Sequence, residues 1–461
     1  MRKKAYLCIW CAECNHIYIA DYDTITPSIL SKVDVLLGLQ WGDEGKGKVV
    51  DVLTPEYDVI ARFQGGPNAG HTLEFNGIKH VLHIIPSGIF HEHKLNITGN
   101  GVLIEPRIFE GEVNALTEKG VDATKNLYIS QKAHLILPSH RMLDAANEQA
   151  KGNAKIGSTL KGIGPAYTDK IARNGLRVGD IMQSDFRERY ELLKCQHLQT
   201  AHSLKFDLDA FRVDGMSLDE YEKLWLASIE TLRRFKLINS EYFINRCLDE
   251  GKRVLAEGAQ GSMLDIDFGS YPFVTSSSTI TAGVCSGLGV APSRIGRVIG
   301  ISKAYCTRVG AGPFPTELFD ETGNRLCQLG HEFGATTGRA RRCGWLDIPA
   351  LRYACMLNGV TDLFVTKPDV MNDFAEVKMC TAYEIEGRQT TEIPFEFNTV
   401  EIKPVLKSFK GWNEDISRCT DYKALPARLR DYLDELESAV GVRIMAVSIS
   451  PDRKDVLYKK D

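Results

Sequence analysis

The chain has 461 residues, of which 43% are hydrophobic and 25% are charged, and its formal net charge is −4. This composition is typical of a soluble globular protein, and the length allows a large core. The small net charge and the lack of a dense basic block argue against nucleic acid as a partner. No uninterrupted apolar run approaches the roughly 20 residues that a membrane-spanning helix needs. The sequence therefore predicts neither a membrane span nor a nucleic-acid-binding surface.

The first 32 residues differ in character from the rest of the chain. A basic start precedes an apolar stretch, as in a signal peptide, but Glu13 interrupts this stretch and no cleavage site is clear. Cys8, Cys11 and Cys14 have CxxCxxC spacing without an obvious fourth ligand, which disfavours a zinc site. We expect residues 1–32 to be a poorly ordered N-terminal extension. The other nine cysteines are scattered singly, which favours reduced thiols in the cytosol over a disulfide framework.

A glycine-rich turn early in the chain organises the rest. It follows the apolar residues 33–37, which we expect to form a buried strand, and it precedes residues 49–53, which are expected to begin a helix. The backbone N–H groups of such a turn and the dipole of the helix favour a bound phosphate. A strand, a turn and a helix in this order therefore predict a nucleotide-binding loop.

The loop differs from an ordinary P-loop in two ways. Gly42 to Lys48 has the spacing GxxxxGK, but Val49 stands where a P-loop carries the hydroxyl that holds magnesium. Asp43 and Glu44 lie inside the loop, where acids would repel a phosphate unless a metal or a proton transfer requires them. We interpret the loop as one that contains its own general base or metal ligand; the alternative is a solvated acidic turn.

A second glycine-rich turn, at residues 61–72, carries Asn68 and His71 after an expected strand. A histidine beside a phosphate loop can donate a proton to developing negative charge. Glycine, hydroxyl and basic residues between 157 and 180, including Arg173, suit a second phosphate such as that of a nucleoside monophosphate. A mobile surface loop explains the composition of that stretch equally well.

The middle of the chain is expected to be helical, over residues 186–199 and 219–238. A strand at residues 253–256 follows, and Gln260, just past its carboxyl end, is placed to contact a ligand. Residues 334–345 contain three arginines without interleaved acids, which favours anions between them over an exposed basic loop.

A short strand at residues 363–365 ends in Thr366-Lys367-Pro368-Asp369. This arrangement is similar to the guanine-binding motif of GTP-binding proteins, in which one carboxylate accepts hydrogen bonds from two N–H donors of guanine that adenine lacks. The chain then ends with an expected helix at 426–440 and a strand at 443–447. The turn at Ser448–Arg453 either closes over a base or ends the sheet.

Taken together, these motifs resemble the adenylosuccinate synthetase family. The match extends from Val33 to Arg453 and includes long motifs in the same order. They are the loop at 40–48, the turn at 68–72, and the segments at 162–167, 257–261, 309–317 and 336–345. The sequence departs from the usual pattern at Pro67, Leu160, Lys161 and Ser450, which affects loop details rather than the reaction.

The resemblance implies one large α/β catalytic domain over residues 33–461, built around a mostly parallel central sheet with helical and loop insertions and a P-loop-like GTP site. It implies a cytoplasmic, Mg²⁺-dependent homodimer that joins IMP and L-aspartate to form adenylosuccinate while GTP is cleaved, through a 6-phosphoryl-IMP intermediate. This is the first committed step from IMP to AMP. It involves neither nucleic acid nor a membrane.

The resemblance also assigns residues. The catalytic residues would be Asp43, the base for N1 of IMP, His71, the proton donor, and Lys46. Magnesium would be held by Asp43 and the Gly70 carbonyl. Contacts to GTP would come from Gly42, Glu44, Gly45, Gly47, Lys48, Gly70, Thr72, Arg341, Lys367, Asp369, Ser448 and Ser450. Contacts to IMP would come from Asn68, Ala69, Thr159, Gln260, Thr275, Arg339 and, across the dimer interface, Arg173. Contacts to aspartate would come from Thr336, Thr337, Gly338 and Arg339.

Two other classes of protein compete with this interpretation. A GTP-binding switch protein would use the nucleotide for regulation, but the missing hydroxyl after Lys48 and the second anion loop argue against it. An ATP-dependent ligase is disfavoured by the guanine-type motif at residues 366–369.

Overall fold

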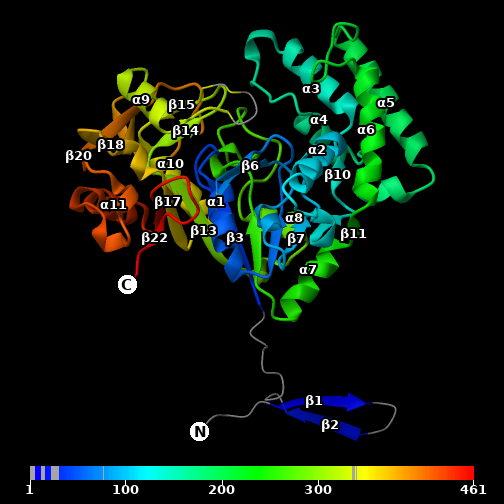
Figure 1. Cartoon of the computed structure of the whole chain (residues 1–461), viewed down its shortest axis with the longest axis horizontal. Coiled ribbons are helices and arrows are strands. Elements are labelled where there is room, and N and C mark those ends of the chain that lie inside the picture. Colours follow the sequence, from blue (N-terminus) through cyan, green and yellow to red (C-terminus); the bar gives the residue numbers. More distant parts are fainter. Residues whose placement is uncertain are drawn as a thin grey trace.

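The computed structural model describes residues 6–11, 16–21, 31–75, 77–334, 338 and 340–460. A ten-stranded sheet forms the centre of the fold, in the order β11-β9-β7-β4-β12-β3-β13-β17-β21-β22 (Figure 1). Neighbouring strands are parallel except for β21 and β22. In chain order the strands are β3 (Val33–Gly38), β4 (Val59–Arg62), β7 (Leu95–Thr98), β9 (Leu127–Ser130), β11 (Lys236–Ile238), β12 (Val254–Glu257), β13 (Ile295–Lys303), β17 (Asp362–Thr366), β21 (Ile444–Ser448) and β22 (Val456–Tyr458). The expected mostly parallel sheet is confirmed.

Helices and smaller sheets surround these strands. The α-helices are α1 (Lys46–Leu53), α2 (Pro106–Thr117), α3 (Pro138–Ala150), α4 (Ile163–Ala172), α5 (Phe186–Ser203), α6 (Leu218–Arg233), α7 (Ser240–Asp249), α8 (Ala282–Leu288), α9 (Glu321–Leu329), α10 (Ile348–Asn358) and α11 (Ala427–Val440). The shorter strands are β5 (His71–Phe75), β6 (Ile78–Leu82), β8 (Leu103–Ile104), β10 (His134–Leu135), β14 (Cys306–Arg308), β15 (Arg342–Gly344), β16 (Leu346–Asp347), β18 (Glu376–Ile385), β19 (Arg388–Thr390) and β20 (Lys403–Lys410).

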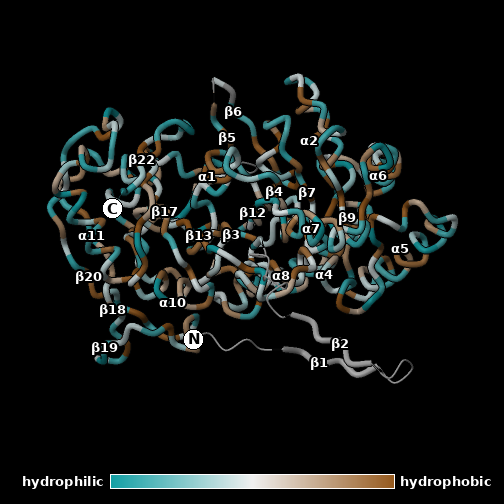
Figure 2. The backbone as a smooth tube through the Cα atoms, turned by 90° about the horizontal axis from the view of Figure 1, so that it is seen from below, coloured by the Kyte–Doolittle hydropathy of each residue, from teal (hydrophilic) through white to brown (hydrophobic). Residues whose placement is uncertain are grey.

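Different helices cover the two faces of the central sheet. Side chains alternate along a strand, so Val33, Val35 and Leu37 of β3 join one hydrophobic core with α7, α8, α10 and α11. Leu36 joins a second core with α1. Figure 2 shows the strands in a row across the molecule with helices on both sides. A sheet buried on both faces explains why its strands are continuous apolar runs in the sequence.

One expected helix is too long. The periodicity predicted a helix over residues 219–238, but α6 ends at Arg233 and the next residues form β11. β11 pairs in parallel with β9 at the edge of the sheet. The backbone groups of these three residues pair with those of β9. If the helix continued to residue 238, the backbone groups at this edge of β9 would lose these partners. The stretch between residues 157 and 180, which suited either a phosphate site or a mobile loop, contains a helix, α4. Gly162, which precedes the helix, has the left-handed backbone conformation.

The N-terminal segment contains two strands, β1 (Tyr6–Cys11) and β2 (His16–Asp21), which pair antiparallel. Aromatic and β-branched residues in both segments favour strands. The expectation that residues 1–32 form a poorly ordered extension stays a prediction. Neither strand joins another sheet in the described part of the chain. Cys14, part of the CxxCxxC pattern, lies outside the described residues.

Two further expectations concern the whole chain. Searched over the described residues, the helices include none that is both long enough and apolar enough to cross a membrane. The nine cysteines from Cys195 to Cys419 are free thiols, as the sequence predicted.

The isolated pairing of β1 with β2 predicts that the extension does not stabilise the rest of the fold. We expect deletion of residues 1–30 to change the free energy of unfolding by less than about 0.5 kcal/mol, which is typical of changes away from the core. Residues 31 and 32 are kept because Arg294 Nη1 donates to the carbonyl of Ser31 at 3.2 Å. The measurement is urea unfolding of both proteins, and a loss beyond about 1 kcal/mol would contradict the expectation.

Candidate active site

Parallel strands end at the same edge of a sheet, and ligands of such sheets bind at that edge. The loops that follow β3, β4, β12, β17 and β21 therefore meet, although they are far apart in the sequence. Thr366 Oγ1 donates to the carbonyl of Glu44 at 2.9 Å, which joins the guanine-type motif to the first loop. Gln260 Nε2 donates to Asn68 Oδ1 at 3.1 Å, which joins the loop after β12 to the second glycine-rich turn.

The first loop is folded around the carboxylate of Glu44. This side chain is 1% exposed, and its Oε1 accepts hydrogen bonds from the backbone N–H groups of Gln40 at 3.1 Å and Gly42 at 3.0 Å. Lys46 Nζ lies 2.5 Å from Oε2. Glu44 thus binds two of the backbone donors of its own loop, and this fixes the curvature of the loop before any ligand arrives.

Two glycines make room for this carboxylate. A Cβ atom on Gly38 would lie 2.2 Å from Glu44 Oε2, and one on Gly261 would lie 2.5 Å from Oε1 and 2.3 Å from the carbonyl oxygen of Gln40. Gly38 is the last residue of β3, and Gly261 follows β12. Both backbones lie so close to Glu44 that a side chain at either position would collide with its carboxylate. The pattern of glycines in the two motifs has this packing as its physical cause.

Lys48, the lysine of the GxxxxGK spacing, contacts the C-terminal turn. Its Nζ donates to Ser448 Oγ at 2.7 Å and to the carbonyl oxygen of Ser450 at 2.5 Å. Burial lowers the pKa of Lys48 to about 8, against the opposing charge of Asp369 and other acids. Asp369 is itself partly buried, which raises the pKa of its carboxyl group. The phosphate loop, the guanine-type motif and the last turn thus form one continuous surface.

A second buried carboxylate, that of Glu332, gathers three cations. Lys303 Nζ and Lys367 Nζ lie 2.8 Å and 2.7 Å from Oε1, and Arg341 Nη1 donates to Oε2 at 2.6 Å. The hydroxyl of Tyr305 also donates to Oε1, at 2.6 Å. Burial favours the neutral acid, but the three cations hold the pKa of Glu332 well below its ordinary value. Lys367 and Arg341 were predicted from the sequence, but the carboxylate that holds them was not.

Arg341 also reaches the first loop. Its Nε lies 2.9 Å from Asp43 Oδ2, an ion pair that is not aligned as a hydrogen bond. Asp43 has a positive φ of 61° and its side chain is 31% exposed. The carboxylate expected to act as the base is therefore accessible and paired with an arginine expected to bind GTP.

His71 is held by Glu257, a residue for which the sequence predicted no role. Its Nδ1 lies 2.5 Å from Glu257 Oε1, and both side chains are buried. Burial, and next the charge of Arg62, lower the pKa of His71 to about 4. A signal was present in the sequence, because Glu257 ends a strand three residues before Gln260.

The remaining predicted residues lie in three places. Thr159 and Arg173 are exposed near α4, and Thr275 is half-buried beside Leu264, whose carbonyl accepts its N–H at 2.9 Å. Gly338 is described, with a φ of 64°. Thr336, Thr337 and Arg339 lie outside the described residues, so the structure does not place the expected aspartate loop.

The donor set fits the hard cation that the family resemblance implies. Mg²⁺ prefers oxygen ligands, and both the Asp43 carboxylate and the backbone at Gly70 are accessible to solvent. Gln260 links their two loops: it donates to Asn68, and its backbone lies 3.8 Å from where a Cβ on Gly42 would be.

Comparisons with known proteins identify the family of the chain. A family model described as adenylosuccinate synthetase matches residues 35–457. The chain belongs to the adenylosuccinate synthetase family. It is 58% identical over 431 residues to the adenylosuccinate synthetase of Porphyromonas gingivalis, covering 94% of this chain and 100% of that protein. It is 58% identical over 428 residues to that of Parabacteroides distasonis, covering 93% and 99%.

A solved structure agrees as well. The fully ligated adenylosuccinate synthetase of Plasmodium falciparum superposes with a TM-score of 0.85 at 36% identity, covering 93% of this chain and 100% of that one. Membership in the family makes the chain a GTP-dependent ligase that joins IMP and L-aspartate. The fold class and the activity implied by the resemblance are thereby confirmed.

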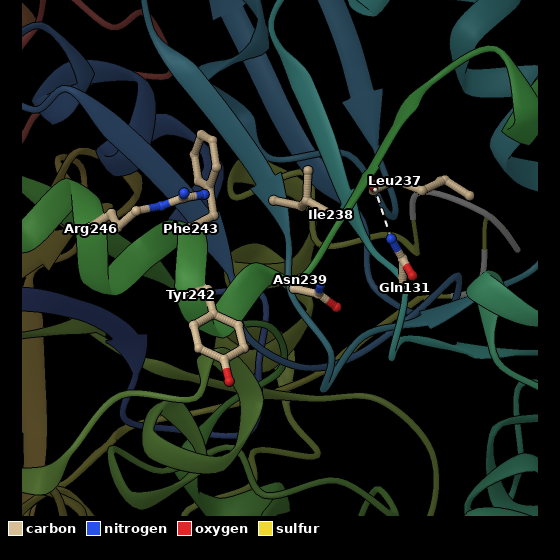
Figure 3. Close-up of a pocket in the computed structure, with 7 residues that line it drawn as sticks. All are labelled: Gln131, Leu237, Ile238, Asn239, Tyr242, Phe243 and Arg246. Atoms are coloured by element: carbon tan, nitrogen blue, oxygen red, sulfur yellow. Dashed lines mark hydrogen bonds between the residues drawn. The ribbon is translucent and has the colours of Figure 1, made fainter.

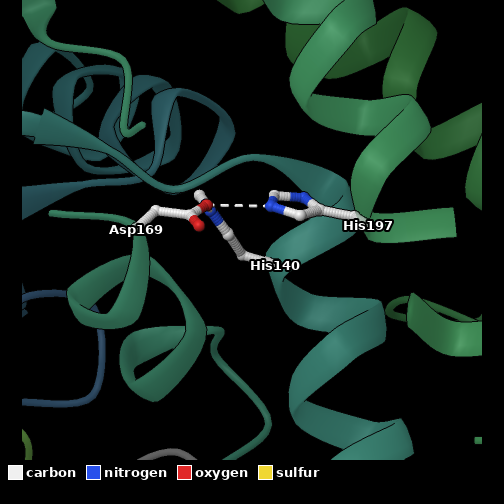
Figure 4. A group of neighbouring side chains, drawn as sticks. All are labelled: His140, Asp169 and His197. Atoms are coloured by element: carbon white, nitrogen blue, oxygen red, sulfur yellow. Dashed lines mark hydrogen bonds and ion pairs between the residues drawn. The ribbon is translucent and has the colours of Figure 1, made fainter. Parts of the chain in front are cut away.

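One cluster resembles a metal site but does not suit one. His140 of α3, Asp169 of α4 and His197 of α5 meet (Figure 4), with His140 Nε2 and His197 Nε2 at 2.7 Å and 2.8 Å from Asp169 Oδ2. His140 Nδ1 accepts the backbone N–H of Leu137 at 2.9 Å, so the ring proton is on Nε2 and that nitrogen cannot bind a metal. The cluster is a hydrogen-bonded network that joins three helices of this family member.

A pocket of about 400 Å³ lies away from the active site, between β11 and α7 (Figure 3). It is lined by Gln131, Leu237, Ile238, Asn239, Tyr242, Phe243 and Arg246. These lining residues include none of those predicted to bind a substrate. β11 is the edge strand of the central sheet, at the far end from β22. The pocket is therefore not the nucleotide site of the ligase.

The packing around Glu44 predicts that Gly261→Ala disrupts the phosphate loop. Its Cβ would collide with backbone and with the Glu44 carboxylate, and such overpacking costs about 1–3 kcal/mol. We expect loss of GTP binding and a lower free energy of unfolding, measured by nucleotide titration and urea unfolding. Gly111→Ala in α2 is the matched control, because a Cβ there meets nothing within 4 Å. A Gly261→Ala protein that binds GTP normally would contradict the packing argument.

The network of His140 predicts a dependence of stability on pH. Burial lowers the pKa of His140 from 6.5 to about 4. The neutral His140 ring therefore contributes fully to the free energy of unfolding above pH 6.5. This contribution is lost as the pH falls toward 4, because His140 takes up a proton in the unfolded chain at a higher pH than in the folded protein. At about 1.4 kcal/mol per pH unit the loss reaches about 3 kcal/mol. Unfolding free energies measured from pH 7 to pH 4.5 should fall more steeply for the wild type than for His140→Gln; parallel curves would contradict the assignment.

Proposed function

We propose that the loops at the carboxyl edge of the sheet hold GTP, IMP and L-aspartate, and that the residues assigned by the family resemblance act on them there. The observation that carries this proposal is the meeting of the phosphate loop with the guanine-type motif, through Thr366 and Glu44, and with the IMP loops, around Gln260. We propose a cytoplasmic location on the same family basis.

Asp43 acts as the base. Removing the N1 proton of IMP makes the 6-oxygen an oxyanion that attacks the γ-phosphate of GTP, and the aspartate amine then displaces phosphate from C6. The accessible carboxylate of Asp43 supports this role. Arg341 pairs with this carboxylate until the substrates bind, and the triphosphate then competes for the arginine.

His71 acts as the proton donor to the transferring phosphoryl group. Its Nδ1 is bonded to Glu257 and its Nε2 is buried without a hydrogen-bond partner among the described residues, which leaves Nε2 for a ligand. The negative charge of a bound triphosphate favours the protonated ring, against the burial that disfavours it.

Asp43 and the carbonyl of Gly70 would hold Mg²⁺, which would supply positive charge to neutralise the phosphates of GTP. Lys46, Lys48 and the backbone of the first loop hold the phosphates of GTP. Asp369 selects guanine, because only guanine presents paired N–H donors to one carboxylate. The Thr336–Arg339 segment binds the carboxylates of aspartate.

We also propose that each site is completed by a second subunit. Arg173 follows α4 with a φ of 67°, it is exposed, and its side chain has no ion pair or hydrogen bond in the part of the chain that the structure describes. An exposed, unpaired guanidinium suits the 5′-phosphate of IMP bound to a partner subunit.

Asp43→Asn should abolish turnover while the fold and GTP binding survive, because the amide cannot accept the N1 proton. The assay follows adenylosuccinate and phosphate in the presence of GTP, IMP and aspartate, and omits each in turn. Asp431→Asn, an exposed change on α11, is the control. Near-normal activity of Asp43→Asn would remove this residue from the mechanism, and GTP turnover without IMP would favour a switch protein.

Arg173→Leu should raise the IMP concentration for half-maximal rate roughly tenfold or more, because a charged hydrogen bond is lost. Mixing this variant with Asp43→Asn should restore activity of normal IMP affinity, since one site of each mixed dimer has Asp43 and the partner's arginine. Mixing it with the double variant Asp43→Asn, Arg173→Leu should restore none. Absence of restoration after confirmed subunit exchange would contradict the shared site.

A further inference from the structure

Glu257 lies at the carboxyl end of β12 with its side chain fully buried. In the sheet it is in register with Leu36 of β3 on one side and Arg62 of β4 on the other. Leu36 belongs to the core that packs on α1, so the side chain of Glu257 faces the same side of the sheet as α1. Burying an ionised carboxylate costs free energy unless its oxygens accept hydrogen bonds.

Three donors surround this carboxylate. Ser87, the first residue of the 3₁₀-helix η3 (Ser87–Phe90), donates its backbone N–H to Oε2 at 2.8 Å and its hydroxyl to Oε1 at 2.6 Å. His71 Nδ1 lies 2.5 Å from Oε1. Burial favours the neutral acid, but the hydrogen bond and charge of His71 and the charge of Arg62 hold the pKa of Glu257 below its ordinary value.

An ionised carboxylate only accepts hydrogen bonds. His71 Nδ1 must therefore carry a proton, and the neutral ring has its lone pair on Nε2. The position of the ring is limited on another side by α1, because a Cβ on Gly47 would lie 2.9 Å from the Cβ of His71. The histidine thus lies against the first turn of the helix that carries the phosphate loop, and Nε2 is its only unpaired ring nitrogen.

Arg62 supports the same arrangement. Its side chain is 0% exposed, and its three guanidinium nitrogens have no hydrogen-bond partner among the described residues. Its charge acts on the adjacent strand position, where it favours the ionised form of Glu257.

We propose that Glu257 is a positioning residue: it holds His71 with Nδ1 protonated and turns Nε2 to the transferring phosphoryl group. This inference rests on the proposed role of His71 as proton donor. Ser87 fixes the carboxylate, and the carboxylate fixes both the tautomer and the rotation of the ring. A purely structural Glu257 would only anchor η3 through Ser87, and its replacement would then change stability rather than the imidazole.

Glu257→Gln separates the two roles. The backbone N–H of Ser87 keeps the side-chain oxygen on its side, so the amide NH₂ turns to His71 Nδ1. Nδ1 must then accept, and the neutral ring proton moves to Nε2. The ¹⁵N spectrum of the imidazole, assigned by comparison with His71→Asn, should show the Nδ1–H tautomer in the wild type and the Nε2–H tautomer in Glu257→Gln.

The kinetic expectation follows from the acidity of the ring. Donation from Nε2 needs a proton on both ring nitrogens, and an amide N–H that faces Nδ1 leaves only the neutral ring, which is a far weaker acid than the imidazolium. For Glu257→Gln, kcat should fall at least about 100-fold, as for loss of a general acid, while KM for GTP and IMP changes less than about threefold. Glu105→Gln is the matched control. Glu105 is equally buried, and its hydrogen bonds go to the N–H of Ile108 at 2.6 Å, which caps α2, and to the hydroxyl of Tyr221 at 3.0 Å, neither of which is a residue assigned to a substrate. It should keep both kcat and the His71 tautomer.

Each outcome decides one claim. An Nε2–H tautomer in the wild-type protein overturns the inference without any variant, even if Glu257→Gln does not fold. An unchanged kcat in Glu257→Gln, with His71→Asn inactive, also overturns it. An active His71→Asn overturns the proposed donor role instead, and the tautomer of the wild type then still reports whether Glu257 fixes the ring.

Discussion

The parallel sheet is the constraint on which the site depends. Because β3, β4, β12, β17 and β21 run in the same direction, the residues that follow them are brought to one edge, whatever their separation in the sequence. The hydrogen bond between Thr366 and Glu44 spans 322 residues of chain, and that between Gln260 and Asn68 spans 192. The insertions between the strands then have only to supply ligands for a surface that the sheet has already defined.

Buried acids hold the hydrogen-bond donors of this surface, both the cations and the His71 ring. Glu44 pairs with Lys46, Glu332 with Lys367 and Arg341, and Glu257 with His71. A cationic side chain without a partner would be mobile or would repel its neighbours in the absence of substrate. A buried acid removes this cost and fixes the donor, so that less conformational entropy is lost when a phosphate arrives. The same acids limit how many donors remain free for the ligand.

Local patterns predicted much of this correctly. The strand at 33–37, the loop after it and the strand before the guanine-type motif depend on short-range periodicity and glycine spacing, and all were found. The residues that support the loops were not found. Glu257 contacts His71 across 186 positions and Glu332 contacts Lys303 across 29, and no local pattern carries such pairs. The helix that was expected to continue to residue 238 failed for a related reason, because pairing with β9 decides the last three residues.

The position of Arg341 follows from the count of charges around it. Glu332 carries one negative charge and faces Lys303, Lys367 and Arg341, so it cannot neutralise all three. Arg341 is the cation that has a second acid within reach, Asp43. Under the proposed roles, the γ-phosphate of GTP competes with Asp43 for Arg341. When the phosphate engages Arg341, the Asp43 carboxylate is released to accept the N1 proton of IMP, at the moment when an acceptor for the oxyanion is in place. Arg341 thus couples nucleotide binding to activation of IMP through side chains that are already in contact.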